Sequence, residues 1–451
     1  MANKPRNIIF AIADSLRYDS VYDGGIKMPY VEENAIQFSE ARSAGCWTLP
    51  ATASLFTGMM PHEHGASSQT RAIHKDIPTL AERMKAAGYN TYQITANIAT
   101  THIFGLDRGF DEVIRIWQHV ESRFNTLQKF LVLIGKPRLR AKLLSKDILM
   151  QRMSSDLETA KTWLQVCYED IFGHARRIIK ENEAKGEKSF IFINLMETHF
   201  PYHIAPTFQM STPGLFKKWR EVYSLFHMVN QTFLKQDKNP IKKDMMPVLK
   251  NRQRLSWELL APHINSFCKE MHKDTGNLMV FGSDHGEAFG DNDWVYHFSN
   301  VTDGGNKVPM FWMDHNTPEA RKVTTPVSTR HIYNSFLKAI GDTPSGPCIF
   351  SESERSNPVM QSYWYNNKGK TMDKFKYNQM CLVIDDERYL IRNGQWHSAP
   401  FKDERGEPRF SPLGKGTNPI EELNLGKERK SDYQKIVKDF TQFTSKISFE
   451  A

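Results

Sequence analysis

The chain has few cysteines and no long apolar run. Its five cysteines lie far apart and form no C-x-x-C pair, so they suggest neither a disulfide framework nor a zinc knuckle and favour a reducing compartment. The longest apolar runs, such as 8–13 and 130–134, are too short to cross a bilayer, so no transmembrane segment is expected. The first run ends at Asp14 with no small-residue cleavage site after it, which favours a buried strand over a signal peptide and predicts a cytoplasmic protein.

The sequence also lacks a strong charge imbalance, an internal repeat and low-complexity segments. The 59 Lys and Arg residues against 51 Asp and Glu residues give a formal net charge of +8. This mild excess permits an anionic substrate without requiring one, and it predicts no stable nucleic-acid complex. The composition, with 40% hydrophobic residues, excludes a disordered or fibrous chain. It does not indicate an oligomeric state.

Apolar segments typical of buried strands alternate with helical patterns. The strand segments are 7–13, 190–195, 278–282 and 308–313, and the helical patterns are 79–87, 171–183 and 256–272. This alternation predicts an α/β fold in which helices sandwich a large, mostly parallel sheet.

We expect residues 1–349 to form the main domain, with helical insertions near 113–182 and 207–255. Residues 350–451 are expected to form a small C-terminal α+β subdomain, with a hairpin at 381–391 and a closing helix at 432–445. Within the first insertion, seven cations between 128 and 152 alternate with Leu and Ile. That stretch is typical of a solvated amphipathic helix, and the alternative is a lid that guides an anionic substrate or rests on an acidic surface.

Ionisable residues follow two of the predicted strands. Asp14 comes directly after strand 7–13, and Asp284 and His285 come directly after strand 278–282. An open α/β sheet places its active site beyond the carboxyl ends of its strands. Carboxylate oxygen with imidazole nitrogen suits Zn or Mn, so these residues predict a divalent metal site; a buried structural Asp–His pair is the alternative.

The segment 48–58 predicts a short helix with Thr48 at its N-terminal end. Pro50 suits a first turn and Gly58 suits a helix exit. On this segment alone, Thr48 is expected to be a capping hydroxyl. The alternative is a nucleophile, because a helix N-terminus stabilises an alkoxide and an incoming phosphate or sulfate. A threonine hydroxyl would need metal coordination to act in this way.

Two histidines lie near the same strand ends. His199 follows strand 190–195, and His297 follows the Asp-His pair by twelve residues. Each could protonate a leaving group, bind a second metal ion or be a buried core residue. Together with the hydroxyl and the carboxylates, they are consistent with a metal-dependent esterase that transfers a phosphoryl or sulfuryl group.

The order of these motifs resembles the sulfatase branch of the alkaline phosphatase superfamily. Residues 48–58 match the eleven-residue sulfatase signature in length and end in the same Thr-Gly pair. Segments 59–65, 80–91, 109–111, 283–287, 307–309 and 418–425 resemble later family motifs in the same order. The resemblance implies a sulfatase-like catalytic domain with one or two divalent ions (Mn, Zn or Ca). It implies metal ligands at Asp14, Asp284 and His285, a nucleophile and further ligand at Thr48, and active-site histidines at His199 and His297.

The chain also departs from the sulfatase pattern. Sulfatases convert a Cys or Ser to formylglycine, which threonine cannot form, and Cys46 lies two positions too early to replace Thr48. Thr52 and Ser15 stand where the family has an arginine and a paired acid, and the segment that supplies the sulfate-binding Lys and His is absent. Asn97 lies in its place and is expected to hydrogen-bond a phosphoryl oxygen.

A threonine nucleophile is typical of the superfamily's phosphodiesterases, nucleotide pyrophosphatases and transferases. The sequence therefore predicts a metal-dependent hydrolase of phosphate diesters or monoesters with a phosphothreonine intermediate. The alternatives are a phosphoryl transferase acting on a glycan or lipid, a sulfate-ester hydrolase without formylglycine, and a degenerate member that only binds anions.

Overall fold

The computed structural model describes residues 4–67, 70–121, 166–203, 209–228, 241–274, 276–297, 300–316, 320–351, 359–362, 378–401 and 409–445. The basic stretch 128–152 of the first predicted insertion lies outside the described residues, as does 229–240 of the second. None of the described helices is long and apolar enough to span a membrane.

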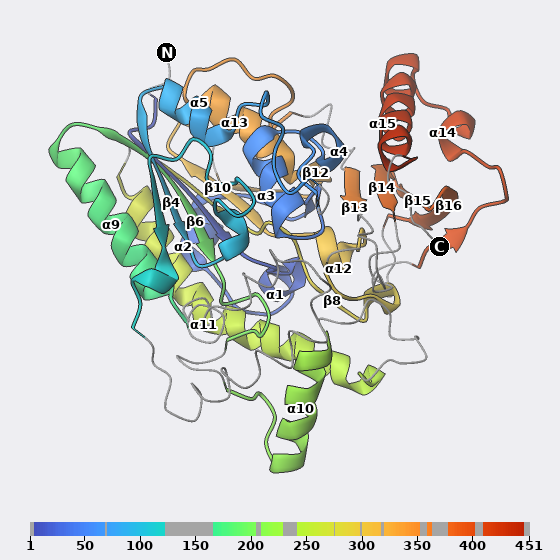
Figure 1. Cartoon of the computed structure of the whole chain (residues 1–451), viewed down its shortest axis with the longest axis horizontal. Coiled ribbons are helices and arrows are strands. Elements are labelled where there is room, and N and C mark those ends of the chain that lie inside the picture. Colours follow the sequence, from blue (N-terminus) through green and yellow to red (C-terminus); the bar gives the residue numbers. More distant parts are fainter. Residues whose placement is uncertain are drawn as a thin grey trace.

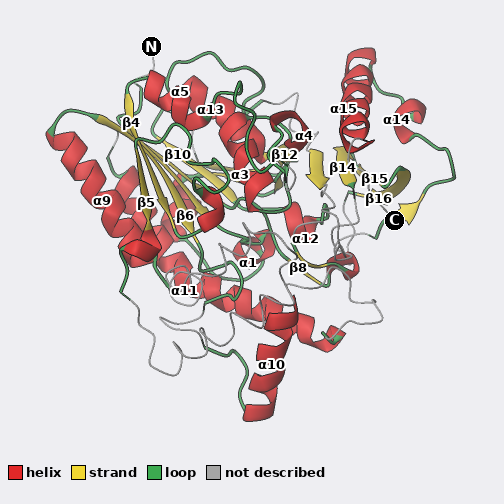
Figure 2. Ribbon diagram, in the orientation of Figure 1, coloured by secondary structure: helices red, strands yellow, loops and turns green. Residues whose placement is uncertain are grey.

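An eight-stranded sheet forms the centre of the molecule, in the order β11-β2-β10-β7-β1-β6-β4-β5 (Figures 1 and 2). Its strands are β1 (Asn7–Ala13), β2 (Ile36–Phe38), β4 (Tyr89–Thr95), β5 (Glu112–Arg115), β6 (Lys188–Leu195), β7 (Asn277–Gly282), β10 (Met310–Asp314) and β11 (Arg321–Val323). The neighbours from β7 to β5 run parallel, whereas β10 is antiparallel to β7 and β2. The predicted large, mostly parallel sheet is confirmed.

Helices cover both faces of this sheet (Figure 2). One face packs against α3 (Thr48–Thr57), α5 (Leu80–Ala86) and α13 (Ile332–Ala339), and the other against α2 (Pro29–Asn34), α9 (Tyr168–Ala184) and α11 (Met246–His272). Side chains alternate between the faces along β1, so Phe10 lies in the first core and its neighbour Ile9 in the second. Burial on both faces explains why the strand sequence is continuously apolar.

The predicted helices are present, with different limits. The pattern at 256–272 is the second half of α11, which begins at Met246 and places Pro247 in its first turn. β5 and α9 overlap the two ends of the predicted insertion 113–182 but belong to the central sandwich. The second predicted insertion contains α10 (Leu215–Met228), the 3₁₀ turn η3 (Lys243–Met245) and the start of α11.

The C-terminal part contains an antiparallel sheet of five strands. Its strands are β13 (Val359–Ser362), β14 (Gln379–Ile384), β15 (Glu387–Arg392), β16 (Gln395–Pro400) and β17 (Ser411–Pro412), with α14 (Pro419–Glu422) and α15 (Lys427–Ser445) beside them. The predicted hairpin is formed by β14 and β15. The predicted closing helix is α15, which begins earlier, at Lys427.

Shorter elements complete the described structure. They are α1 (Tyr18–Tyr22), β3 (Ala41–Arg42), α4 (Pro61–His64), η1 (Ile98–Thr100), η2 (Ile116–Gln118), β8 (Ala288–Phe289), η4 (Asp291–Asp293), β9 (Val295–Tyr296), α12 (Asp303–Asn306), β12 (Val327–Ser328) and η5 (Thr329–His331). Several of them lie beyond the carboxyl ends of the central strands and surround the candidate site.

Candidate metal and nucleophile site

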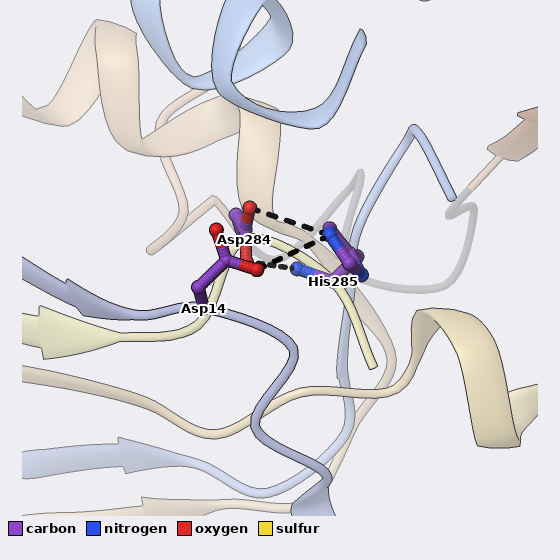
Figure 3. A group of neighbouring side chains, drawn as sticks. All are labelled: Asp14, Asp284 and His285. Atoms are coloured by element: carbon purple, nitrogen blue, oxygen red, sulfur yellow. Dashed lines mark hydrogen bonds and ion pairs between the residues drawn. The ribbon is translucent and has the colours of Figure 1, made fainter. Parts of the chain in front are cut away.

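Two neighbouring parallel strands place three ionisable residues side by side. In the register of β1 and β7, Ile12 lies opposite Gly282, so Asp14 emerges beside Asp284 and His285. One potential ligand atom from each of these residues lies within 4.8 Å of the others (Figure 3). All three residues are fully buried. Two carboxylates and one imidazole at this spacing could hold a divalent cation.

The electrostatics of this cluster favour a bound cation. Burial, together with the nearby charge of Asp14, raises the pKa of Asp284 well above its usual range. Burial would also raise the pKa of Asp14, but His199 and His285, together with hydrogen bonds from Asn97 and Ser15, lower it. Asp284 Oδ2 is buried and accepts no hydrogen bond from the described residues. This oxygen is therefore suited to a metal, and the donor set fits the divalent cation that the sequence predicts.

His285 is held in the tautomer that a metal ligand needs. Its Nδ1 donates to the carbonyl oxygen of Gly286 at 2.8 Å, which leaves the lone pair of Nε2 available. Nε2 lies 3.5 Å from Asp284 Oδ2 and 3.7 Å from Asp14 Oδ1. Burial lowers the pKa of His285 and so favours the neutral imidazole that binds metals.

Thr48 is the first residue of α3, and its hydroxyl faces the carboxylates. The helix is capped by Trp47 without a side-chain bond, so the expectation that Thr48 is a capping hydroxyl is wrong. Thr48 Oγ1 lies 3.4 Å from Asp14 Oδ2 and 3.5 Å from His285 Nε2. The hydroxyl therefore lies where a metal-bound nucleophile would be needed.

The loop before Thr48 is held by hydrogen bonds from α12. Asn306 in α12 donates from Nδ2 to the carbonyl oxygens of Ser43 and Gly45, at 3.1 and 3.0 Å. A Cβ atom at Gly45 would lie 2.6 Å from the backbone nitrogen of Ala51, so only glycine allows the loop to pass this close to α3. These contacts determine where the helix begins and where the hydroxyl of Thr48 lies.

Two asparagines and a serine surround Asp14. Asn97, which follows β4, donates from Nδ2 to Asp14 Oδ2 at 2.7 Å and lies 3.4 Å from Thr48 Oγ1. Asn194 in β6 donates to the same oxygen at 3.4 Å, and Ser15 Oγ donates to Asp14 Oδ1 at 3.0 Å. Sequence reasoning missed Asn194, although it is the only polar residue within the apolar segment 190–195.

The two predicted histidines lie next to the metal-ligating candidates. The ring centroid of His297 is 4.7 Å from that of His285 and 5.4 Å from that of His199. Burial is the main cause that lowers the pKa of His199, while the charge of Asp14 opposes it. His199 Nδ1 donates to the carbonyl oxygen of Phe200 at 2.9 Å. The structure thus brings all the predicted residues to one edge of the sheet: Asp14, Thr48, Asn97, His199, Asp284, His285 and His297.

Glu287 is a further residue of this site that sequence reasoning did not single out. Its carboxylate lies 3.1 and 3.2 Å from His297 Nδ1 and accepts a hydrogen bond of 2.9 Å from the hydroxyl of Tyr202. The Nδ1–H of His297 therefore points to Glu287, which leaves Nε2 for proton exchange. Its place two residues after the Asp-His pair was the only sequence signal.

Comparisons with known proteins agree with this fold. The ulvan-active sulfatase of Formosa agariphila is 23% identical over 352 residues, which cover 73% of this chain but only 61% of that protein. The phosphonate monoester hydrolases of Silicibacter pomeroyi and Agrobacterium radiobacter superpose on this chain with TM-scores of 0.61 and 0.62, at 15% sequence identity. Each superposition covers 98% of this chain and 96% of the other protein. The family model named Sulfatase matches residues 6–342. The chain therefore belongs to the sulfatase family.

Proposed function

We propose that this chain is a metal-dependent phosphohydrolase in which Thr48 is the nucleophile. The observation that carries the proposal is that Thr48 Oγ1 lies 3.4 Å from Asp14 and 3.5 Å from His285 instead of capping its helix. Asp14, Asp284 and His285 would hold the cation. When bound, such a cation lowers the pKa of a coordinated hydroxyl and stabilises charge on phosphoryl oxygens.

The residues of the chain then have separate tasks. The hydroxyl of Thr48 gives its proton to Asp14 Oδ2, which lies 3.4 Å away, and its oxygen attacks phosphorus while the bond from phosphorus to the leaving oxygen breaks. His297, held through Nδ1 by Glu287, gives a proton from Nε2 to that leaving oxygen. The Nδ2 group of Asn97 lies between Asp14 and Thr48, where it can also donate to a phosphoryl oxygen. Water then attacks the phosphothreonine and gives a proton to His297 Nε2, and the phosphate leaves as Asp14 returns a proton to the oxygen of Thr48.

Hydrolysis of sulfate esters is the second candidate function. The family match and the similarity to an ulvan-active sulfatase favour it. Thr48 argues against sulfatase activity. The sulfatases whose signature this chain resembles use a formylglycine aldehyde, and threonine cannot be converted to that aldehyde. Transfer of a phosphoryl group to a glycan or lipid requires the same attack by Thr48 and differs only in the acceptor of the second step.

The test is turnover of aryl esters by the purified chain and its Thr48→Ala variant. The substrates are a phosphate monoester, a phosphate diester, a phosphonate monoester and a sulfate, each with Mn, Zn or Ca added. We expect turnover of a phosphorus ester that falls about 10⁴-fold or more in the variant while bound metal is retained. Wild-type activity in Thr48→Ala would exclude this nucleophile. Turnover of the sulfate alone would establish the second candidate, and metal binding without any turnover would favour a transferase or an anion-binding protein.

A further inference from the structure

Helix α10 carries the large apolar side chains that are exposed in the described part of the chain. Leu215, Phe216 and Trp219 are 87%, 71% and 62% exposed, and Tyr223 is 37% exposed. Single exposed apolar residues are common on protein surfaces, whereas a contiguous group indicates an interaction site. This helix extends from the body of the molecule at the lower edge of Figure 1.

These side chains form one stripe on the outer face of α10. At 3.6 residues per turn, positions 215, 216, 219 and 223 fall within an arc of about 100°. The rings of Trp219 and Tyr223 are stacked, with centroids 5.5 Å apart. Leu225 and Met228, on the opposite face, are buried in a cluster with residues of η3, α11, β8 and β9. The helix therefore has two apolar faces, and the described residues cover only the inner one.

Cations lie on either side of this stripe: Lys218 and Arg220 on α10, and Lys242 and Lys243 in the turn whose Asp244 pairs with Arg220, while Lys217 is exposed on the far side of the helix. Of the two acids in the same segments, Glu221 is buried and bound to Arg252, and Asp244 is bound to Arg220 at 2.8 Å. The exposed charge around the stripe is therefore net positive. A cationic border around exposed Leu, Phe and Trp is typical of helices that lie in a membrane interface.

We propose that α10 docks this chain on an anionic lipid surface. Leu215, Phe216 and Trp219 would enter the headgroup region, and the lysines would contact lipid phosphates. An acidic polysaccharide could stack on Trp219 and pair with the lysines, but it would leave Leu215 and Phe216 in water. An apolar groove of a protein partner would cover the stripe without needing its cationic border. A bilayer surface matches both features.

The inner face of α10 connects this surface to the candidate site. The hydroxyl of Tyr202 lies 3.8 Å from Met228 Sδ and donates to Glu287, which holds His297. Docking would therefore place the candidate site beside substrates held at a membrane. It does not require turnover by Thr48, so its test is separate from that of the proposed function.

The test is cosedimentation of the full chain with lipid vesicles. One set contains phosphatidylcholine alone, and the other contains phosphatidylcholine and phosphatidylserine in equal amounts. The variants are Phe216→Ser with Trp219→Ser, and Lys217→Glu with Lys218→Glu. The matched control is Lys435→Glu with Lys438→Glu on α15, where both lysines are exposed. Thermal melting checks that every variant is folded, which we expect because the substituted side chains are exposed.

We expect the wild type to sediment with the phosphatidylserine vesicles and to be released by salt. Each α10 variant should lower partitioning about tenfold or more, and the control should leave it unchanged. A wild type that stays in the supernatant, or α10 variants that bind as well as wild type, would overturn the proposal. Retention on heparin without vesicle binding would assign the surface to an acidic polysaccharide instead. A dimer that Phe216→Ser dissociates would assign it to a second copy of the chain.

Discussion

The side-chain amide of Asn97 donates a hydrogen bond of 2.7 Å to Oδ2 of Asp14. Its own Oδ1 accepts from the backbone nitrogen of Ala99 at 2.8 Å, so the amide cannot turn without losing both bonds. The carboxylate that follows β1 is thus oriented by the residue that follows β4. The bond helps to hold the carboxylate of Asp14 beside Asp284 and His285.

Replacing Asn97 by Ala should weaken metal binding more than it weakens folding. Partners that orient metal ligands typically contribute about 10- to 100-fold in affinity, so we expect a loss in that range. The measurement is metal titration of the chelator-treated protein. The control is Asn90→Ala in β4, which removes an exposed hydrogen bond to Glu187. This variant should bind metal normally. Equal affinities of the Asn97 and Asn90 variants would rule out the orienting role.

Asp284→Asn should stabilise the metal-free protein and abolish its response to metal. Asparagine retains an oxygen that can accept from the backbone nitrogens of Ser15 and His285, at 3.2 and 2.9 Å, but it removes a buried charge. We expect a higher melting temperature than wild type at neutral pH after chelation, and no increase when metal is added. Asp432→Asn, on the exposed face of α15, should change neither property. A variant that retains stoichiometric metal would contradict the assignment of Asp284 as a ligand.

The contribution of Asp284 to the stability of the metal-free wild type should fall as pH rises. The pKa of Asp284 in the folded chain is raised well above its ordinary value of 3.8, by burial and then by Asp14. Below pH 3.8 the carboxyl group is protonated in both the folded and the unfolded chain, so it does not lower the free energy of unfolding. Above it, ionisation favours the unfolded chain until the raised pKa is passed. Melting curves with and without metal should therefore differ more at neutral pH than in acid, and a constant difference would argue against this origin.

Glu287→Gln should affect substrates according to their leaving groups. Glutamine can still accept from His297 Nδ1, but it no longer stabilises the protonated imidazole by charge. We expect a loss of about 10²-fold in kcat/KM on alkyl esters, which need a protonated leaving group, and little loss on nitrophenyl esters. Equal losses on both classes would show that Glu287 only supports the structure.

Asp303→Asn should be strongly destabilising. Asp303 lies between two buried arginines, with distances of 3.0 Å to Arg42 Nε and 2.8 Å to Arg388 Nη2. Removing one charge of a buried ionic group leaves its partners uncompensated, so we expect a loss of about 3 kcal/mol or more in the free energy of unfolding. Denaturant unfolding measures it. Glu181→Gln, which breaks the exposed pair with Arg177, is the comparison and should cost less than about 1 kcal/mol.

The sequence predicted well those parts of the fold whose pattern of apolar residues is compatible with only one structure. Continuous apolar segments such as β1 must be buried on both faces, and an acid at the end of such a strand lies at the edge of the sheet. The predicted residues met there because β7, β1, β6 and β4 are consecutive neighbours.

Other features depend on contacts that no local pattern records. The sequence around Thr48 favoured a helix-capping hydroxyl. Only the contacts with Asp14 and His285 show that the hydroxyl faces these side chains instead. Asn194 and Glu287 contact Asp14 and Tyr202, which are remote in sequence, so their place in the sequence was only a weak signal. The start of α11 was missed because two of the residues that it buries there, Arg252 and Gln253, are polar and interrupt the apolar pattern.

The central sheet also determines when the site can exist during folding. Ser15 and Asp284, which are hydrogen-bonded, are 269 residues apart in sequence, and the strands between them supply the remaining groups. A nascent chain that has not yet added β7 has a hydroxyl and one carboxylate but no complete ligand set. Metal uptake would therefore report the addition of β7 to the sheet, and its rate during refolding would time that step.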